Sequence, residues 1–234
     1  MKTCLHVLYI FYLVDLYMSN IYVPGCALMS YKQHLADKLI KFLEPLYGHS
    51  ETLYSCCFNK PDIKYDARIL TPCVACMEVY EKRGYSVNYV LADIAKSNDF
   101  PFPDYGGMAM SIQDTCYARK RPDVHETIRL LLQRMNIRII EPQATCTHSK
   151  CCGHALYGKA ATAKVEELMR KRAGEMPCDD VVVYCASCIV SMSVGGKKPH
   201  YILDLLFDEQ TDMHDLSLDG WNKKLNSFKN QPPI

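Results

Sequence analysis

The sequence lacks an apolar run long enough to cross a bilayer, an excess of either charge, and a glycine-rich nucleotide-binding loop. The apolar stretch Leu5–Val14 is too short for a membrane span and ends at Asp15. With 27 Lys and Arg against 26 Asp and Glu, the charge gives no support for nucleic acid as a partner. Because no Gly-x-Gly-x-x-Gly occurs, the chain carries no flavin or nicotinamide fingerprint.

Glycine and proline are also scarce, with 11 and 12 residues in 234, while 49% of residues are hydrophobic. Such a composition excludes collagen-like and disordered chains and is ordinary for a globular protein. Residues 1–19 are expected to be an N-terminal extension, with Met18 as a candidate start. A signal peptide is the alternative, but no small-residue cleavage site follows the apolar stretch. We therefore expect a cytoplasmic protein without a membrane span.

Cysteine is unexpectedly frequent, with 13 residues. A chain of this length does not need disulfides to fold. In a reducing compartment, clustered cysteines are most often metal ligands.

Strand-like runs alternate with helical patterns twice along the chain. The sequence therefore predicts an α/β fold of two pseudo-duplicated cysteine-rich halves, each with a small, mostly parallel sheet flanked by helices. The halves span residues 20–107 and 108–208, with a linker at 98–107 and a polar C-terminal tail of little order at 209–234. Finer predictions include a strand at 85–91, a helix at 159–176 and a helix opening at Cys188.

The cysteines fall into two sets with one order: a single cysteine, an adjacent pair, then Cys-x-x-Cys. The members of the two sets are Cys26, Cys56, Cys57, Cys73 and Cys76, and then Cys116, Cys151, Cys152, Cys185 and Cys188. Three cysteines fall outside this order, Cys4, Cys146 and Cys178, and we interpret Cys146 as a plain cysteine.

Cys-x-x-Cys at the start of a helix brings two sulfurs to one centre, where backbone N–H groups stabilise thiolates. Adjacent cysteines do not easily chelate one small ion, because successive side chains diverge, but they suit a group of several metal atoms. An iron–sulfur cluster is such a group. Structural zinc, a thioredoxin-like pair, disulfides or plain burial are the alternatives; zinc would leave a fifth cysteine unexplained twice. We also expect Gly153 to let the backbone approach the cluster.

The repeated order resembles the cysteine-rich CCG domain found in heterodisulfide reductase and in related iron–sulfur proteins. The resemblance covers about residues 20–208 and is carried best by the second half. There it rests on Asp114-Thr115-Cys116, Arg129-Leu130-Leu131, Cys151-Cys152-Gly153, Cys185-Ala186-Ser187-Cys188 and the stretch from His200 to Leu206. The first half departs from the pattern, with Phe58 in place of the glycine and a short gap between Cys57 and Cys73.

The resemblance implies that each five-cysteine set holds one noncubane [4Fe–4S] cluster, so that up to two clusters are bound. It also implies that a disulfide of small thiols is cleaved or formed between the clusters. Electrons would come from a ferredoxin-like or flavin-containing redox subunit. His154, directly after the Cys-Cys-Gly, is the candidate to donate a proton to a leaving thiolate, with a solvent-facing loop residue as the alternative.

Two other functions remain open on the sequence. One is an electron-transfer subunit that docks on a flavoprotein and has no substrate of its own. The other is a zinc-stabilised binding module.

Overall fold

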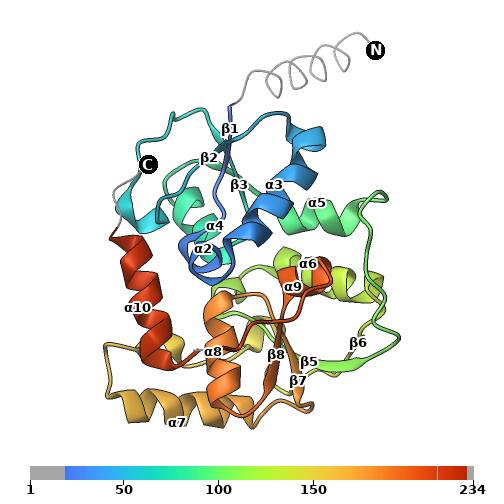
Figure 1. Cartoon of the computed structure of the whole chain (residues 1–234), viewed down its shortest axis with the longest axis vertical. Coiled ribbons are helices and arrows are strands. Elements are labelled where there is room, and N and C mark those ends of the chain that lie inside the picture. The colour runs from blue at the N-terminus through green and yellow to red at the C-terminus, as the bar shows by residue number, and fades with distance from the viewer. Residues whose placement is uncertain (1–18, 215, 231–234) are drawn as a thin grey trace.

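The computed structural model describes residues 19–214 and 216–230, so the prediction for residues 1–18 lies outside the described residues. Two α/β halves lie one above the other, with the first half in blue to green and the second in green to orange (Figure 1). Each half contains one four-stranded sheet.

The first sheet has the order β2-β1-β3-β4, and all its neighbouring strands run parallel. Its strands are β1 (Asn20–Tyr22), β2 (Glu51–Thr52), β3 (Arg68–Thr71) and β4 (Ser86–Tyr89). The second sheet has the order β6-β5-β7-β8, again all parallel. Its strands are β5 (Ala109–Gln113), β6 (Arg138–Ile139), β7 (Asp180–Val183) and β8 (Lys198–Tyr201). The two halves therefore share one topology, which confirms the predicted fold class.

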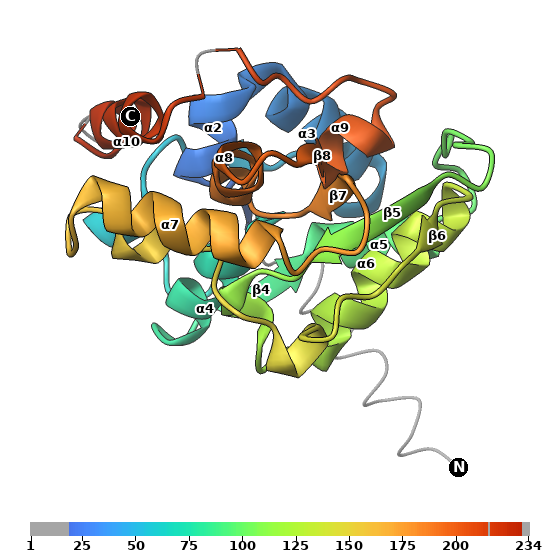
Figure 2. The same ribbon diagram turned by 90° about the horizontal axis from the view of Figure 1, so that it is seen from below.

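Nine α-helices connect and flank the strands in the described part of the chain. They are α2 (Cys26–Tyr31), α3 (Gln33–Tyr47), α4 (Val74–Glu81), α5 (Val90–Lys96), α6 (Pro122–Arg134), α7 (Thr162–Ala173), α8 (Ala186–Val194), α9 (Ile202–Leu206) and α10 (Leu218–Lys229). Helices α7 and α8 pack side by side (Figure 2). Between the halves, α5 packs on α6 and α2 packs on α8.

One hydrophobic core runs through both halves. It joins Tyr22 and Leu70 of the first sheet to Ile112 and Val182 of the second, all of them buried. The predicted linker at 98–107 has no helix or strand, yet Phe100 within it is buried and packs against Phe42 and Phe207. The two sequence halves therefore pack into one body.

Several predicted boundaries need correction. The apolar run at 85–91 is not one strand, because β4 ends at Tyr89 and α5 begins at Val90. Helix α7 is shorter than predicted and spans Thr162–Ala173. Helix α8 begins at Ala186, with Cys185 rather than Cys188 at its start.

The C-terminal tail is more ordered than predicted, since it forms α10. The buried residues of this helix are Leu218, Trp221, Asn222 and Leu225, which lie on one face at helical spacing. The Ser217 hydroxyl caps the helix by accepting a hydrogen bond from the Gly220 N–H. A serine cap followed by this spacing is the signal that sequence reasoning missed.

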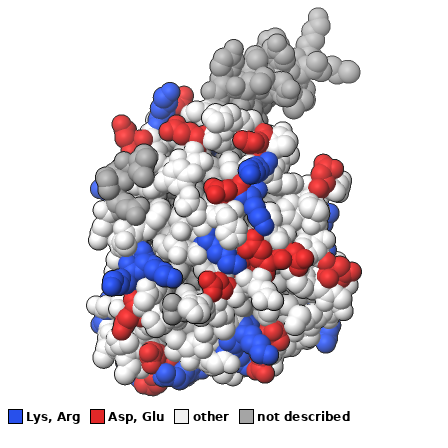
Figure 3. All heavy atoms as spheres, viewed as in Figure 1, with Lys and Arg blue, Asp and Glu red and all other residues white. Residues whose placement is uncertain are grey.

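Among the described residues, no helix is both long and apolar enough to span a bilayer. On the face seen in Figure 3, acidic and basic side chains are interspersed rather than gathered by sign.

A network of charges ties the first half to the segment after α9. Lys32 Nζ lies 2.6 Å from Asp204 Oδ1, which is fully buried. Glu209 contacts Lys38 at 2.7 Å and His34 at 2.8 Å. Partial burial would raise the pKa of Glu209, but hydrogen bonds from Lys38, His34 and Lys32 outweigh it and lower the pKa to about 2.

Replacing Glu209 by glutamine is expected to lower the free energy of unfolding by on the order of 1 kcal/mol near neutral pH. The pKa of Glu209 in the folded protein lies below the ordinary value of about 4.3. The stabilisation by ionised Glu209 is therefore complete above about pH 4.3. It is lost as the pH falls toward about 2. Urea unfolding of both proteins between about pH 7 and pH 3 checks this. The control is Glu166→Gln, an exposed pair with Arg170 on α7. An equal difference at both pH values would contradict the assignment.

Candidate metal centres

The cysteines of both sets lie beyond the carboxyl ends of the central strands. Cys26 follows β1, and Cys73 follows β3, its neighbour in the first sheet. Cys116 and Cys185 follow β5 and β7, which are neighbours in the second sheet. Because parallel strands end at the same edge of a sheet, cysteines far apart in sequence meet there. The loops with the adjacent pairs reach the same two places.

Within each half the five thiols contact one another in the same hydrogen-bonded sequence. The single cysteine contacts the first cysteine of the adjacent pair, which contacts the second cysteine of that pair. The second cysteine of the pair contacts the last cysteine of Cys-x-x-Cys, which in turn contacts the first cysteine of Cys-x-x-Cys. In the first half this order is Cys26, Cys56, Cys57, Cys76 and Cys73. In the second it is Cys116, Cys151, Cys152, Cys188 and Cys185. All ten residues that sequence reasoning selected are thus brought together as two groups of five, an arrangement compatible with metal binding.

The same sulfur in each group favours the thiolate. A hydrogen bond from Cys26 lowers the pKa of Cys56, and one from Cys116 lowers the pKa of Cys151. Cys185 also has a lowered pKa, about 7, through its hydrogen bond with Cys188 and through backbone N–H groups. Hydrogen bonds to neighbouring thiols and burial raise the pKa of the remaining ligand candidates, Cys26, Cys57, Cys76, Cys116, Cys152 and Cys188. Because the thiolate is the metal-binding form of cysteine, the lowered pKa values of Cys56, Cys151 and Cys185 are compatible with metal binding.

Backbone amides at two helix starts face the Cys-x-x-Cys sulfurs, as the sequence predicts. Cys73 is the N-cap residue of α4, and its sulfur accepts from the N–H groups of Ala75 and Cys76. Cys185 is the N-cap residue of α8 and accepts from Ser187 and Cys188. These N–H groups lie in the first turn, where helices leave backbone donors without internal partners.

Two glycines near the cysteine groups leave no room for a side chain, each because of a different neighbour. Gly25 has φ +87°, and a Cβ there would lie 3.1 Å from Cys73 Cβ and 3.4 Å from Cys76 Sγ. It therefore lets the chain pass directly against the Cys-x-x-Cys, a role that sequence reasoning missed. A Cβ at Gly153 would instead lie 3.1 Å from Met169 Cγ on α7. Glycine is therefore required here by its packing against α7, while its N–H donates to the Cys151 sulfur. That the Gly153 backbone approaches a cluster stays a prediction.

Buried polar atoms without a partner gather around the two groups. Eight such side-chain atoms occur among the described residues, and four adjoin the cysteines: those of Ser55, Tyr80, Tyr89 and His154. Ser55 precedes Cys56, while Tyr80, Tyr89 and His154 are within electrostatic reach of Cys76, Cys73 and Cys151. An unpartnered buried donor is unfavourable by about 1–3 kcal/mol. A bound group with acceptor atoms would partner these donors, which is compatible with metal binding at the two cysteine groups.

His154 is half-buried rather than a freely solvated loop residue, and burial lowers its pKa. Its Nε2 atom is buried and unpartnered, and Cys151 lies within electrostatic reach. His154 therefore lies beside the second group, and its role as a proton donor stays a prediction.

Helix α10 lies on the outside of the molecule and packs against α2 and α8 (Figure 1). Trp221 Nε1 donates to the Ser187 hydroxyl, inside the second Cys-x-x-Cys, at 3.0 Å. Asn59 lies two residues beyond Cys57 in the first group. Its Nδ2 donates a hydrogen bond at 2.7 Å to the carbonyl of Lys229, at the other end of α10.

A third group of ligating side chains consists of Asp114, His125 and Cys146, whose ligand atoms lie within 4.8 Å of one another. The Asp114 carboxylate already accepts two hydrogen bonds from Arg129, at 2.8 and 2.9 Å. It also accepts from Tyr184 at 2.8 Å and from the Cys146 N–H at 2.7 Å. A cation would have to displace the guanidinium, so Asp114 serves as the centre of a structural hydrogen-bond network. Cys146 joins this network through its backbone N–H, and its interpretation as a plain cysteine stays a prediction.

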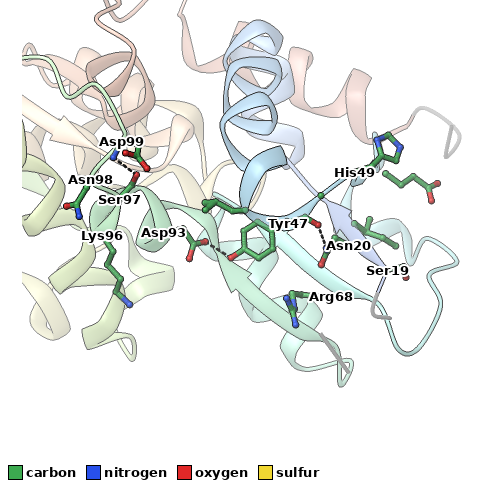
Figure 4. A pocket seen from close by; sticks show the side chains of 14 residues that line it. Ser19, Asn20, Tyr47, His49, Arg68, Asp93, Lys96, Ser97, Asn98 and Asp99 are labelled. Atoms are coloured by element: carbon green, nitrogen blue, oxygen red, sulfur yellow. Dashed lines mark hydrogen bonds between the residues drawn. The ribbon is translucent and has the colours of Figure 1, made fainter. Parts of the chain in front are cut away.

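Cavities at the cysteine groups include one of about 320 Å³ that Cys116 lines. Two others differ in their relation to the groups. A small one, of about 40 Å³, lies at the seam between the halves, where Cys73 and Cys185 both line it. A larger one, of about 1140 Å³, lies at the amino ends of β1 and β3 and includes Asn20, Tyr47 and Asp93 (Figure 4). Because the cysteines follow the opposite ends of these strands, the larger cavity is separate from both cysteine groups.

The chain matches no protein-family model, and a search of curated proteins finds no match. Its function must therefore be inferred from the cysteine groups themselves.

Proposed function

We propose that this chain is an iron–sulfur redox protein that reduces or forms a disulfide of small thiols, in the manner of heterodisulfide reductase. The observation that carries the proposal is the repeated contact order of five thiols in both halves. A structural zinc site needs four ligands and would leave one thiol over in each half. The CCG-like motifs support the same function.

In this proposal each five-cysteine group holds one noncubane [4Fe–4S] cluster. A bound cluster supplies one electron at a time, and disulfide reduction needs two. The chain's own contribution is to bind and orient the reacting sulfur at the seam, where Cys73 and Cys185 approach the same cavity. His154 donates a proton to a leaving thiolate beside the second group. Electrons enter from a ferredoxin-like or flavin-containing partner.

A second candidate is an electron-transfer subunit without its own substrate. The small volume of the seam cavity, about 40 Å³, favours it, because little room is present for a substrate in this conformation. The two functions differ in one observation: a thiol added to the oxidised protein changes the EPR spectrum of an enzyme but not that of a relay.

Metal and acid-labile sulfide content of anaerobically purified protein tests the proposal. We expect about eight irons and about eight sulfides in the wild type, and about half of each in Cys73→Ser and in Cys185→Ser, because each loses a ligand of one cluster. Cys178→Ser is the matched control, since Cys178 is a half-buried cysteine outside both groups. Four irons lost only with Cys185→Ser would restrict the cluster to the second half. Zinc without sulfide would contradict the redox function and leave a zinc-stabilised binding module.

A further inference from the structure

Two tyrosines occupy equivalent positions in the two halves. Tyr89 is the last residue of β4 and Tyr201 the last residue of β8, and each is followed directly by a short helix. Both β4 and β8 end the strand order of their sheets, so the shared topology places the two side chains alike. Both are buried, with 7% and 5% of their surface exposed.

Both tyrosines lie near Cys-x-x-Cys sulfurs, and Tyr201 lines the seam cavity together with Cys73 and Cys185. Cys73 lies within electrostatic reach of Tyr89 and of Tyr201, and Cys185 within reach of Tyr201. The Tyr89 hydroxyl is buried and has no hydrogen-bond partner. Since an unpartnered buried hydroxyl is unfavourable, this one is poised for an acceptor that the polypeptide itself does not supply.

The residues that line the seam cavity include few side chains that could donate a hydrogen bond to a bound ligand. No charged side chain lines it, and apart from its cysteines its polar lining residues are Thr115, Tyr117, Tyr184 and Tyr201. Thr115 hydrogen-bonds to Cys185, and Tyr184 donates to Asp114 at 2.8 Å. Tyr117 is 43% exposed and faces the outer end of the cavity.

Tyr201 remains as the inner residue whose hydroxyl is uncommitted among the described residues. Its backbone N–H is held by Thr211, and its ring packs edge-on against Tyr31 at a centroid distance of 5.4 Å. The ring is therefore fixed, while the hydroxyl has no protein partner in the described part of the chain. A fixed ring with a free hydroxyl is the arrangement that a ligand-positioning residue needs.

We propose that Tyr201, which lines the seam cavity, donates a hydrogen bond to the sulfur of a small thiol bound there between Cys73 and Cys185. This inference rests on the proposed function and names the group that holds its substrate. The ligand class follows from the lining: a compact sulfur compound whose reacting end is uncharged apart from the sulfur. Binding makes and breaks no covalent bond, and Tyr201 acts as a positioning residue.

The test uses anaerobically purified, oxidised protein with its full iron content and 2-mercaptoethanol as the probe. The apparent dissociation constant is read from the EPR change during titration. We expect Tyr201→Phe to weaken binding about tenfold, because a hydrogen bond to a charged sulfur is lost, and Tyr89→Phe to leave it unchanged, because Tyr89 lines a different cavity. Iron content and melting temperature should stay unchanged in both. Tyr65→Phe, at a site 81% exposed, is the matched control.

Equal affinity for the wild type and Tyr201→Phe would overturn the inference and leave the proposed function standing. An absent thiol-dependent signal with full iron content would overturn both the inference and the disulfide chemistry, and would favour the electron-transfer subunit. Tyr89→Phe is a second control, because it removes the unpartnered hydroxyl of a buried tyrosine outside the seam cavity and should not destabilise the protein.

Discussion

Replacing Asp114 by asparagine is expected to lower the free energy of unfolding by about 3–5 kcal/mol, the range found when one partner of a buried ion pair is removed. Asp114 is fully buried and forms a bidentate pair with Arg129, at 2.8 and 2.9 Å. Burial alone would raise its pKa, but the Arg129 guanidinium outweighs burial and holds the pKa at about 2. Asparagine keeps the volume and removes the charge. Glu141, the other partner of Arg129, is 40% exposed and does not replace a buried carboxylate.

The consequences extend to the second cysteine group. Asp114 lies two residues before Cys116, and its oxygens hold Tyr184, the residue before Cys185, and the backbone of Cys146. We therefore expect Asp114→Asn to lose iron from the second half as well as stability. Urea unfolding and metal content measure the two effects.

Asp123→Asn is the matched control, because Asp123 also pairs with an arginine but is exposed. It should change stability by no more than about 1 kcal/mol. Similar losses in the two variants would show that the buried network is not what stabilises this end of the second sheet.

The importance of Asp114 could not be read from the sequence alone. The stretch Asp114-Thr115-Cys116 and Arg129 stood out only as parts of a resemblance, because an ion pair between a strand end and a helix depends on how the two pack. The same limit applies to Cys146, which lies 32 residues from Asp114 in the chain but donates its backbone N–H to it. Local patterns do not report such contacts.

The features that could be predicted from the sequence are those that depend on residues close together in the chain. The periodicity of apolar residues and the prolines and glycines that end elements gave the alternation of strands and helices, and the repeated cysteine order gave the two groups. The identical order of strands in the two sheets could not be predicted, since it depends on pairing between distant segments. Helix α10 was missed because its sequence is mostly polar, and a single narrow apolar face holds it to α2 and α8.

The second large effect is expected from Gly195→Ala, at the end of α8. Its φ of −77° would suit any residue, so the glycine is not required by backbone conformation. It is required by space: a Cβ at Gly195 would lie 2.1 Å from Ala173 Cβ on α7. Neither methyl group can rotate away, so α7 and α8 must separate. We expect the free energy of unfolding to fall by about 3 kcal/mol, the upper part of the range for overpacked cores.

Gly174→Ala is the matched control one residue beyond Ala173. Its backbone is helical, and a Cβ there would meet only the Arg170 carbonyl oxygen at 3.4 Å and the Lys171 carbonyl oxygen at 3.6 Å. This variant should be as stable as the wild type or slightly more stable, because alanine restricts the unfolded chain. Urea unfolding compares the two glycine variants directly.

A double variant tests the mechanism itself. In Gly195→Ala with Ala173→Gly, the methyl group moves from one helix to the other and the close approach of α7 and α8 is preserved. Because the two positions are in contact, the two changes should not add, and most of the lost stability should return. If the double variant is less stable than Gly195→Ala, the distance between these helices is not the cause. The packing of α7 on α8 matters for function because α8 begins directly after Cys185. A shift of α8 would therefore move the second Cys-x-x-Cys away from the sulfurs that it contacts.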